Sequence, residues 1–517
     1  MQGRQWLWAA GIAGAGLTSW LAWGARFELG VSGEWTWERR PPAPDLGLVL
    51  LPALLAAAAC VGLVWLGSQR IDRCGRAERW SWLVALAAAT WAWLWCAPEC
   101  APPGHQLNRI PRVLYYPGSS GYFTVARGQT GSVSDFLKSY ADRMALQEDW
   151  LHLGTHPPGL VVAYRGLIEL CRAAPAVTDL LIFTQPRAVC DAFDLIAANA
   201  RGSATPLMRE DRAVLWLAAM LVQGGAALTV LPLYALLRLW YRPLACWLAA
   251  AFWPAVPAMA VFLPKSDALY PFLGTLFLWL WLAGWRKKSA LLSCAAGVVL
   301  FAGMNLTLAL LPVVFLAGCL TVWEGWLAAP HDRIAGAEPR LWHGLVFCSA
   351  GFGVPCTAAW LAWRLNLPEV WFWNYQNHAL FYRHFVRTYW KWLAVNPLEL
   401  IVAAGAPLSL IALASTAGVW RAPRSRHAGV LYSVGATWIC LWLSGKNMGE
   451  ASRLWLVLMP SLILVAGAAF DDKPPAESEA TAARERRILQ DWAVGLGCQF
   501  AAALAIVTRI VGFSSPS

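Results

Sequence analysis

Gly154-Thr155-His156-Pro157-Pro158-Gly159 marks the point where a long polar stretch, residues 98–156, gives way to apolar sequence. Two consecutive prolines disfavour helix for the residue before them and fix the turn that follows. We therefore expect His156 to be extended at the mouth of a helix, where the apolar sequence begins and near a membrane surface. A titratable side chain held there is a candidate active-site group. The alternative is a solvated histidine at an ordinary proline-initiated helix start.

The composition is that of a polytopic membrane protein. Hydrophobic residues make up 58% of the chain and charged residues 14%, whereas a soluble protein carries about a quarter charged residues. The 34 tryptophans suit a protein with many membrane–water interfaces, where indole rings concentrate. The net charge of +11 comes from basic residues in short loops between apolar runs. That is the positive-inside pattern, so we expect no nucleic-acid partner.

The thirteen cysteines are scattered, mostly within apolar runs, and form no CxxC pair. Neither a metal site nor a disulfide framework is expected from them. Cys96 and Cys100 bracket the outer end of a predicted helix, but a bridge across Cys-Ala-Pro-Glu-Cys would be strained. We expect both to be reduced.

We predict an all-α fold with about thirteen transmembrane helices, because each span needs roughly twenty apolar residues. The first reads as an uncleaved span, since no convincing small-x-small cleavage site follows it. The predicted spans are 7–25, 47–67, 80–97, 213–237, 244–263, 268–285, 289–304, 306–327, 343–363, 397–418, 428–444, 453–470 and 491–511.

The arginine and lysine residues of the short loops set the predicted orientation. With the N-terminus in the cytoplasm, the strongly basic loops all fall on the cytoplasmic side. Three larger polar segments then face outward, and a short fourth, 445–452, joins them. The three are residues 26–46, 98–212 and 364–396.

Residues 159–173 are predicted to be an amphipathic helix lying in the membrane interface. Arg165, Glu169 and Arg172 recur at helical spacing on one face, with apolar residues opposite. The whole of 98–212 then stays outside as one juxtamembrane unit, between an N-terminal three-span segment and a transmembrane core. The predicted divisions are 1–97, 98–212, 213–470 and 471–517, the last beginning with a solvated linker, disordered or loosely helical, over 471–490.

Carboxylates, imidazoles, cations and aromatic rings gather in these outward segments. Such side chains suit recognition of sugars and phosphates, because aromatic rings stack on pyranose faces while Arg and Lys bind phosphate. Candidate catalytic residues are Asp135, Asp149, His156 and Asp267. Candidate substrate-binding residues are Tyr122, His152, Lys265, His378, Arg383, Glu450 and Arg453.

Several of these residues have a purely structural alternative. The aromatic residues of 371–392 can form an interface belt, and Lys265 can snorkel to the membrane surface. Glu450 and Arg453 can be a local i,i+3 ion pair that caps a helix. Asp267 is harder to explain this way, because a carboxylate at a span terminus costs energy unless it is solvated, paired or used.

The order of these motifs resembles the GT-C superfamily of integral membrane glycosyltransferases, which includes protein O-mannosyltransferases and lipid A aminoarabinose transferases. The similarity covers residues 98–290 best: a polar outer loop, His156-Pro157-Pro158, an interfacial helix, and a span closing in a basic turn at 237–242. The Pro264-Lys265-Ser266-Asp267 stretch is similar to the family's Asp at the outer end of a following span. Residues 450–455, Glu-Ala-Ser-Arg-Leu-Trp, resemble the family's Glu-x-x-Arg-aromatic segment.

The resemblance implies an outward-facing transferase that uses a polyprenyl-phosphate sugar as donor and a glycan, lipid or protein as acceptor, without a resident cofactor or metal. An outer-loop carboxylate would act as general base, and cations would hold the departing phosphate. His156 would lie near the phosphate or acceptor, and would bind phosphate only when protonated. The family's usual Asp before Tyr122 is replaced by Gly118-Ser119-Ser120-Gly121, so Asp135, Glu148, Asp149 or Asp267 would have to supply the base.

The sequence thus favours a glycosyltransferase of the bacterial cytoplasmic membrane with an extracytoplasmic site. Two alternatives stay open. The missing Asp is compatible with a GT-C-derived protein that holds a lipid or glycan without turning it over. A transporter is less favoured, because few charged residues fall in the middle of the predicted spans.

Overall fold

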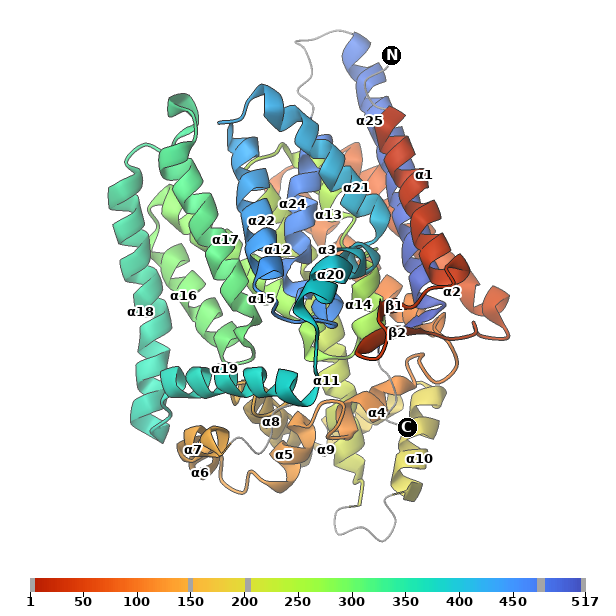
Figure 1. The fold of residues 1–517 in the computed structure, drawn as a ribbon, viewed down its shortest axis with the longest axis vertical. Helices are drawn as coiled ribbons and strands as arrows, with labels where there is room; N and C mark the ends of the chain where they lie inside the picture. The colour runs from red at the N-terminus through yellow and green to blue at the C-terminus, as the bar shows by residue number, and fades with distance from the viewer. Residues whose placement is uncertain (1–4, 147–151, 200–205, 472–478, 513–517) are drawn as a thin grey trace.

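The computed structural model describes residues 5–146, 152–199, 206–471 and 479–512, and it is overwhelmingly helical (Figure 1). The N-terminal part comprises α1 (Gln5–Ser19), strands β1 (Leu29–Val31) and β2 (Trp35–Arg39), α2 (Leu46–Ser68) and α3 (Arg76–Glu99). Seven short helices follow: α4 (Arg109–Tyr115), α5 (Tyr122–Gly128), α6 (Val133–Lys138), α7 (Tyr140–Ala145), α8 (Gly159–Ala173), α9 (Pro175–Phe183) and α10 (Arg187–Asn199).

The remaining helices form the main bundle. Its first half contains α11 (Arg209–Leu228), α12 (Val230–Leu237), α13 (Pro243–Ala250), α14 (Pro257–Phe262), α15 (Tyr270–Lys287), α16 (Ala290–Met304) and α17 (Leu311–Val322). Its second half contains α18 (Ala337–Trp363), α19 (Leu367–His384), α20 (Tyr389–Ala404), α21 (Ala406–Ser415), α22 (Arg426–Leu443), α23 (Ala451–Leu454), α24 (Met459–Ala466) and α25 (Glu479–Val507), followed by strand β3 (Ile510–Val511).

Seven helical segments of the described chain are long and apolar enough to cross a membrane, or eight if one bent pair counts as a span. These make the chain a multi-pass membrane protein, but they do not confirm the predicted thirteen spans. The predicted spans at 289–304 and 453–470 correspond to shorter apolar helices, Ala290–Met304 and Leu456–Ala469. The predicted span at 244–263 is two short helices, α13 and α14, each beginning at a proline. The linker region turns helical at Glu479, where α25 begins.

The predicted span at 397–418 is not one continuous helix. The structure has α20 and α21 there, bent by 104° at the break between them. Gly405 occupies the break with φ +85°, a conformation that residues with a Cβ rarely adopt. The backbone groups left unpaired at this buried break are satisfied by Gln499 of α25, which donates to the Ala404 carbonyl (2.7 Å) and accepts from the Leu408 N–H (2.9 Å).

A small antiparallel sheet in the order β1-β2-β3 departs from the all-α expectation. Leu29 pairs with Trp37, and Arg39 pairs with Ile510, so the sheet joins a segment near each end of the chain. Arg39 also donates to the carbonyls of Leu21 (3.1 Å) and Phe27 (2.7 Å). The hairpin is therefore held both by β3 and by the segment that follows α1.

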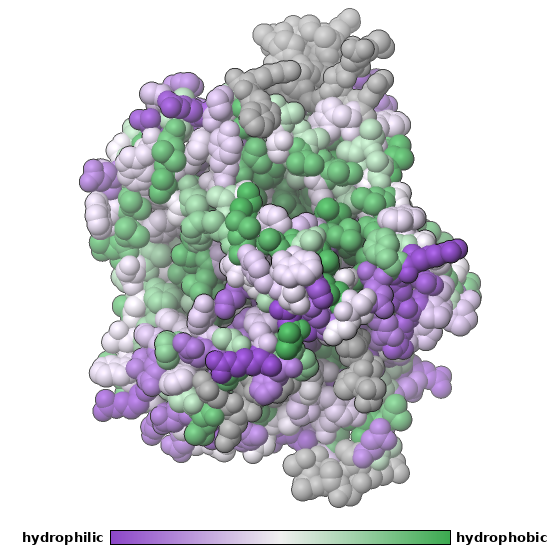
Figure 2. Space-filling model, in the orientation of Figure 1, coloured by the Kyte–Doolittle hydropathy of each residue, from purple (hydrophilic) through white to green (hydrophobic). Residues whose placement is uncertain are grey.

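The short helices α4 to α10 gather at one end of the bundle, and α19 runs across the long helices at that same end (Figure 1). In the same orientation, hydrophobic residues spread over the long helices, whereas hydrophilic residues gather toward the end with α19 (Figure 2). The predicted interfacial helix 159–173 is present as α8 with the bounds expected. The polar end therefore unites segments 98–199 and 364–396, which are distant in sequence.

Many tryptophans lie inside the protein rather than at its interfaces. Eight of the tryptophans that the structure describes are fully buried, among them Trp247, Trp253 and Trp492. Their indole N–H groups donate to backbone carbonyls of neighbouring helices at 2.7–2.9 Å. A buried indole needs such a partner, so these tryptophans join helices as well as filling space. The cysteines of the described residues, including Cys96 and Cys100, are free thiols.

We predict that Gly405→Ala destabilises the protein by about 1–3 kcal/mol, because the new Cβ requires a strained backbone. It would also lie 2.4 Å from the Gln499 side chain. Gly353→Ala is the matched control, since no atom lies within 4 Å of its added Cβ. Thermal unfolding in detergent measures both variants. Equal unfolding temperatures for the two would contradict the role given to Gly405.

Candidate functional site

A cavity of about 600 Å³ lies at the polar end of the bundle. Its wall draws on the β1–β2 hairpin, the loop before α8, the connection between α14 and α15, helix α19 and residues 441–457. Four cationic side chains line it: Lys265, Arg387, Lys446 and Arg453. Its aromatic lining includes Trp35, Trp37, Tyr375, Phe381, Tyr382 and Trp455. Cations and rings thus face one shared space.

Six of the eleven predicted site residues line this cavity: His152, His156, Lys265, His378, Glu450 and Arg453. Two more support it from behind. Tyr122 is buried, with its ring 5.6 Å from that of His156 and 6.4 Å from that of His152. Asp267 is buried with a carboxylate oxygen 3.9 Å from Arg453 Nε.

Asp135 and Arg383 do not line the cavity. Asp135 lies in the first turn of α6, where its side chain is 76% exposed and pairs with Lys138 at 3.5 Å. Arg383 is exposed on α19, whose cavity-facing positions near its end are held by His378, Phe381 and Tyr382. The predicted base Asp149, like Glu148, lies outside the described residues.

The backbone carbonyl of His156 is held by two hydrogen bonds. Its carbonyl accepts hydrogen bonds from Tyr140 Oη (2.8 Å) and from Asn374 Nδ2 (3.1 Å). Helix α8 starts at Gly159, as the double proline predicted. A Cβ at Gly159 would lie 2.3 Å from the Asn305 carbonyl oxygen, so the approach of these two backbones requires glycine.

The surroundings of the His156 imidazole favour its neutral form. Burial lowers its pKa, and the nearby Asp267 carboxylate offsets this only in part. Nδ1 lies 3.0 Å from the carbonyl oxygen of His152, which assigns the proton to Nδ1 and leaves Nε2 as a hydrogen-bond acceptor. His156 is therefore suited to accept a proton or a hydroxyl hydrogen bond, and not to bind phosphate as a cation.

The other two histidines of the cavity are neutral as well. Burial, with Lys265 nearby, lowers the pKa of His152 to about 3. Burial, with Lys446 nearby, lowers the pKa of His378 to about 4. The positive charge of the cavity thus comes from lysine and arginine side chains.

Arg453 is the most firmly held of these cations. Its Nη2 lies 3.0 Å from a carboxylate oxygen of Glu450, and its Nε lies 3.9 Å from a carboxylate oxygen of Asp267. Burial opposes the charge, but Glu450 and Asp267 together raise its pKa. The expected i,i+3 ion pair exists and both of its members line the cavity, but the Glu450 side chain makes no capping hydrogen bond to α23.

Buried amides of α19 hold the loop before α8. Asn374 and Asn377 both donate to the Gly154 carbonyl, at 2.8 and 3.0 Å, and Asn377 also donates to the Met144 carbonyl at 3.0 Å. Asn377 carried no motif that would single it out. The only sequence sign of its role is that two asparagines stand three positions apart in a segment rich in aromatic residues.

Glu34, Trp35, Trp37 and Arg387 line the cavity but were not among the predicted site residues. The first three come from the β1–β2 hairpin, within a segment expected only to be polar and outward. Alternation of Trp35, Thr36 and Trp37 after Gly33 is the strand and turn pattern that could have revealed it.

The described residues contain no group of three or more His, Cys, Asp or Glu side chains able to hold a metal ion.

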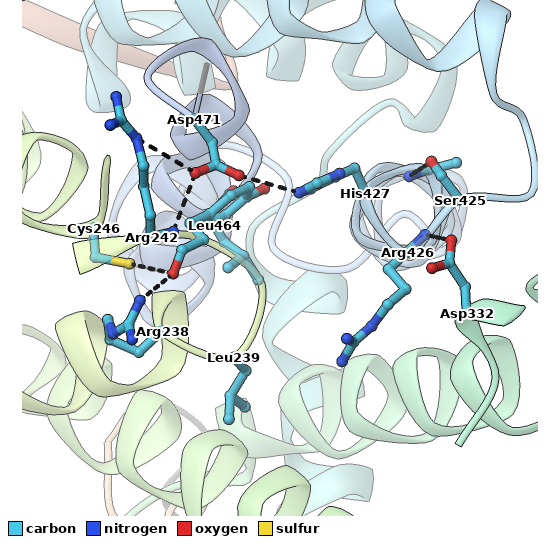
Figure 3. Close-up of polar contacts among 12 residues, drawn as sticks. Arg238, Leu239, Arg242, Cys246, Asp332, Ser425, Arg426, His427, Leu464 and Asp471 are labelled. Atoms are coloured by element: carbon cyan, nitrogen blue, oxygen red, sulfur yellow. Dashed lines mark hydrogen bonds and ion pairs between the residues drawn. The ribbon is translucent and has the colours of Figure 1, made fainter. Parts of the chain in front are cut away.

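A second polar cluster lies at the other end of α22 (Figure 3). Asp471 accepts the Arg242 N–H at 3.1 Å and lies 3.6 Å from His427, whose ring stacks on that of Tyr241 at 5.3 Å. Tyr241, His427 and Asp471 line a smaller cavity of about 260 Å³. These contacts join the α12–α13 turn, the start of α22 and the segment after α24. The role of the cluster is therefore structural.

Comparison with known proteins gives little sequence support. No family model matches the chain, and no curated protein matches it. A similar solved structure is the Archaeoglobus fulgidus oligosaccharyltransferase, crystallised in complex with Zn and sulfate. The identity is 13%, the TM-score is 0.39, and the match covers 84% of this chain. The chain spans 54% of the length of that protein. A similarity at this TM-score supports neither a fold assignment nor a function for this chain.

We predict that Lys265 titrates near neutral pH. Burial, with Arg453 nearby, lowers its pKa to about 7, so its amine becomes neutral and reactive as the pH rises through 7. The rate of acetylation by acetic anhydride, followed by mass spectrometry against pH, measures this midpoint. Arg453→Gln should move the midpoint upward, because it removes a neighbouring positive charge. A wild-type midpoint near the ordinary lysine value of about 10.4 would contradict the prediction.

Proposed function

We propose that the protein is a membrane glycosyltransferase that moves a sugar from a polyprenyl-phosphate donor to an acceptor at the extracytoplasmic face of a bacterial cytoplasmic membrane. The observation that carries the proposal is the cavity itself: four cations and a set of aromatic rings around one space, at the polar end of a bundle of apolar helices. The acceptor is a glycan, a lipid or a protein.

The cations suit the phosphate of such a donor. When the glycosidic bond to phosphate breaks, negative charge grows on the departing phosphate, and fixed cations stabilise it without having to reorganise. Arg453 is fixed by Glu450 and Asp267. Lys446 lies over the Tyr375 ring at 4.1 Å. We assign Arg453, Lys265 and Arg387 to the phosphate, with Lys446 closing the side toward α19.

The aromatic lining suits the sugar. Trp35, Trp37 and Tyr382 come from two different segments and line the cavity, and aromatic rings are side chains on which a pyranose can stack. Asn447 adds an amide group for its hydroxyls. The apolar helices around the cavity would hold the polyprenyl chain.

Glu450 is the carboxylate best placed to act as general base. It lines the cavity, whereas Asp267 lies behind Arg453 and Asp135 lies on the outer surface. We therefore assign proton removal from the acceptor hydroxyl to Glu450, hydrogen bonding of that hydroxyl to His156 Nε2, and orientation of Arg453 to Asp267. No metal ion takes part in this assignment.

A second candidate function is binding without turnover. Gly118 and Ser119 line the cavity at the place where the resembled family carries its Asp. A protein that lacked a base there would hold a lipid-linked sugar and not transfer it. Co-purification of such a lipid without transfer to any acceptor would favour this alternative.

We predict that His156→Ala and Asp267→Asn abolish consumption of a radiolabelled polyprenyl-phosphate sugar by membranes containing the protein, with expression unchanged. A lost hydrogen-bonding or proton-transfer group costs about 10²–10⁴-fold in rate. Asp135→Asn is the matched control, because Asp135 lies outside the cavity. Wild-type turnover by both cavity variants would remove the assignment.

We also predict that Glu450→Gln lowers kcat by about a hundredfold or more and changes KM for the donor much less, because the amide keeps the shape but cannot take a proton. Steady-state kinetics with the purified protein measures both constants. If Glu450→Gln raised KM alone, Glu450 would be a binding residue and the base would have to be sought elsewhere.

A further inference from the structure

We propose that Glu34 is a positioning residue of the cavity, whose carboxylate holds the start of α20 so that Arg387 faces the phosphate of the substrate. This inference rests on the proposed function, since it assigns Arg387 to the anionic part of the donor. It names a residue from the N-terminal hairpin, far in sequence from the other members of the site.

The hairpin is a firm support for such a residue. Glu34 closes its turn by donating its N–H to the Val31 carbonyl at 3.0 Å, next to Gly33 with φ +79°. Strand β2 is paired on both edges, with β1 and with β3. The side chain of Glu34 is only 10% exposed.

The carboxylate of Glu34 is fully engaged by the start of α20. It accepts hydrogen bonds from the Thr388 N–H (2.8 Å), the Thr388 hydroxyl (2.6 Å), the Trp392 indole (2.8 Å) and Lys391 Nζ (3.3 Å). The first N–H groups of a helix lack intrahelical partners. At α20 the N-cap Thr388 makes no side-chain cap, and Glu34 supplies an acceptor from a remote segment instead.

The same contact sets the position of Arg387, the residue before Thr388. Arg387 Nη1 donates to the Glu34 carbonyl at 2.7 Å, and its guanidinium lies 5.8 Å from the centre of the Trp35 ring. Trp35 in turn packs on Gly449, where an added Cβ would lie 3.2 Å from the Trp35 side chain. Glu34 thereby aligns a cation, an aromatic ring and the segment that carries Glu450.

Glu34 is unsuited to be the proton acceptor itself. Burial acts to raise its pKa, but hydrogen bonds from Thr388, Trp392 and Lys391 overcome this and lower it to about 2. A carboxylate of that pKa is a weak base at neutral pH, and its lone pairs already serve four donors. Glu34 therefore acts by holding the start of α20 and Arg387 in position.

Two measurements on purified protein in detergent test the proposal, using Glu34→Gln, Arg387→Ala and the double variant. Glu28→Gln is the matched control, because Glu28 accepts its hydrogen bond from Ser32 within the hairpin. The first measurement is hydrogen exchange of residues 385–392, which needs no ligand. The second is the Kd of farnesyl phosphate as a probe, with farnesol as the uncharged comparison.

Glu34→Gln should speed exchange at Thr388 and weaken farnesyl phosphate binding about tenfold each, the size expected for lost hydrogen bonds to a charged group. Farnesol binding should not change. In the Arg387→Ala background, Glu34→Gln should weaken binding less than about twofold, since the two residues act as one unit. Glu28→Gln should match wild type in both measurements.

Unchanged exchange in Glu34→Gln would overturn the proposal, because Glu34 would not hold α20. So would an equal loss of affinity with and without Arg387. If wild-type protein failed to bind farnesyl phosphate, the proposed function and the substrate-facing role of Arg387 would fall. The exchange result would still decide whether Glu34 holds the helix.

Discussion

Arg453 and its two carboxylate partners are the interaction on which the site depends. A guanidinium removed from water loses much of its hydration energy, and it stays charged only if nearby carboxylates compensate. Glu450 precedes Arg453 by three residues, whereas Asp267 comes from the connection between α14 and α15. The ion pairs therefore fix how two distant parts of the bundle meet. Loss of either carboxylate would leave the buried guanidinium with a single carboxylate partner.

The polar end of the protein is likewise held together by polar contacts between segments that are distant in sequence. Backbone carbonyls of the loop before α8 are taken up by buried amides of α19, and the start of α20 is capped by Glu34 from the hairpin. In each case a backbone group that lacks a backbone partner is hydrogen-bonded by a side chain remote in sequence. Irregular backbone next to a membrane requires such partners. The cavity can thus be open and polar while its walls stay fixed.

The sequence was sufficient to predict those features that follow from local rules. The helix start at Gly159 follows from the two prolines before it, and the amphipathic pattern of 159–173 predicts α8. The sidedness of the loops placed His156, Lys265 and Glu450 in one group, and the cavity does bring these three together. Each prediction used either a local backbone rule or the distribution of charge along the chain.

The features that were missed depend on tertiary contacts. A hydropathy window cannot distinguish one continuous helix over 397–418 from two helices bent at Gly405, because both are equally apolar. Asp135 matched the required residue type, but its helix points it to solvent. Glu34 looked like one more charge in an outer loop, and only the packing of the hairpin on α20 gives it a role.

The most direct test of the account is a structure of the purified protein with farnesyl phosphate, determined by cryo-electron microscopy. The account predicts phosphate density within hydrogen-bonding distance of Arg453, with the isoprenoid chain leaving the cavity along the apolar helices. Phosphate bound instead at the smaller cavity of Tyr241 and His427, with the larger cavity empty, would contradict it.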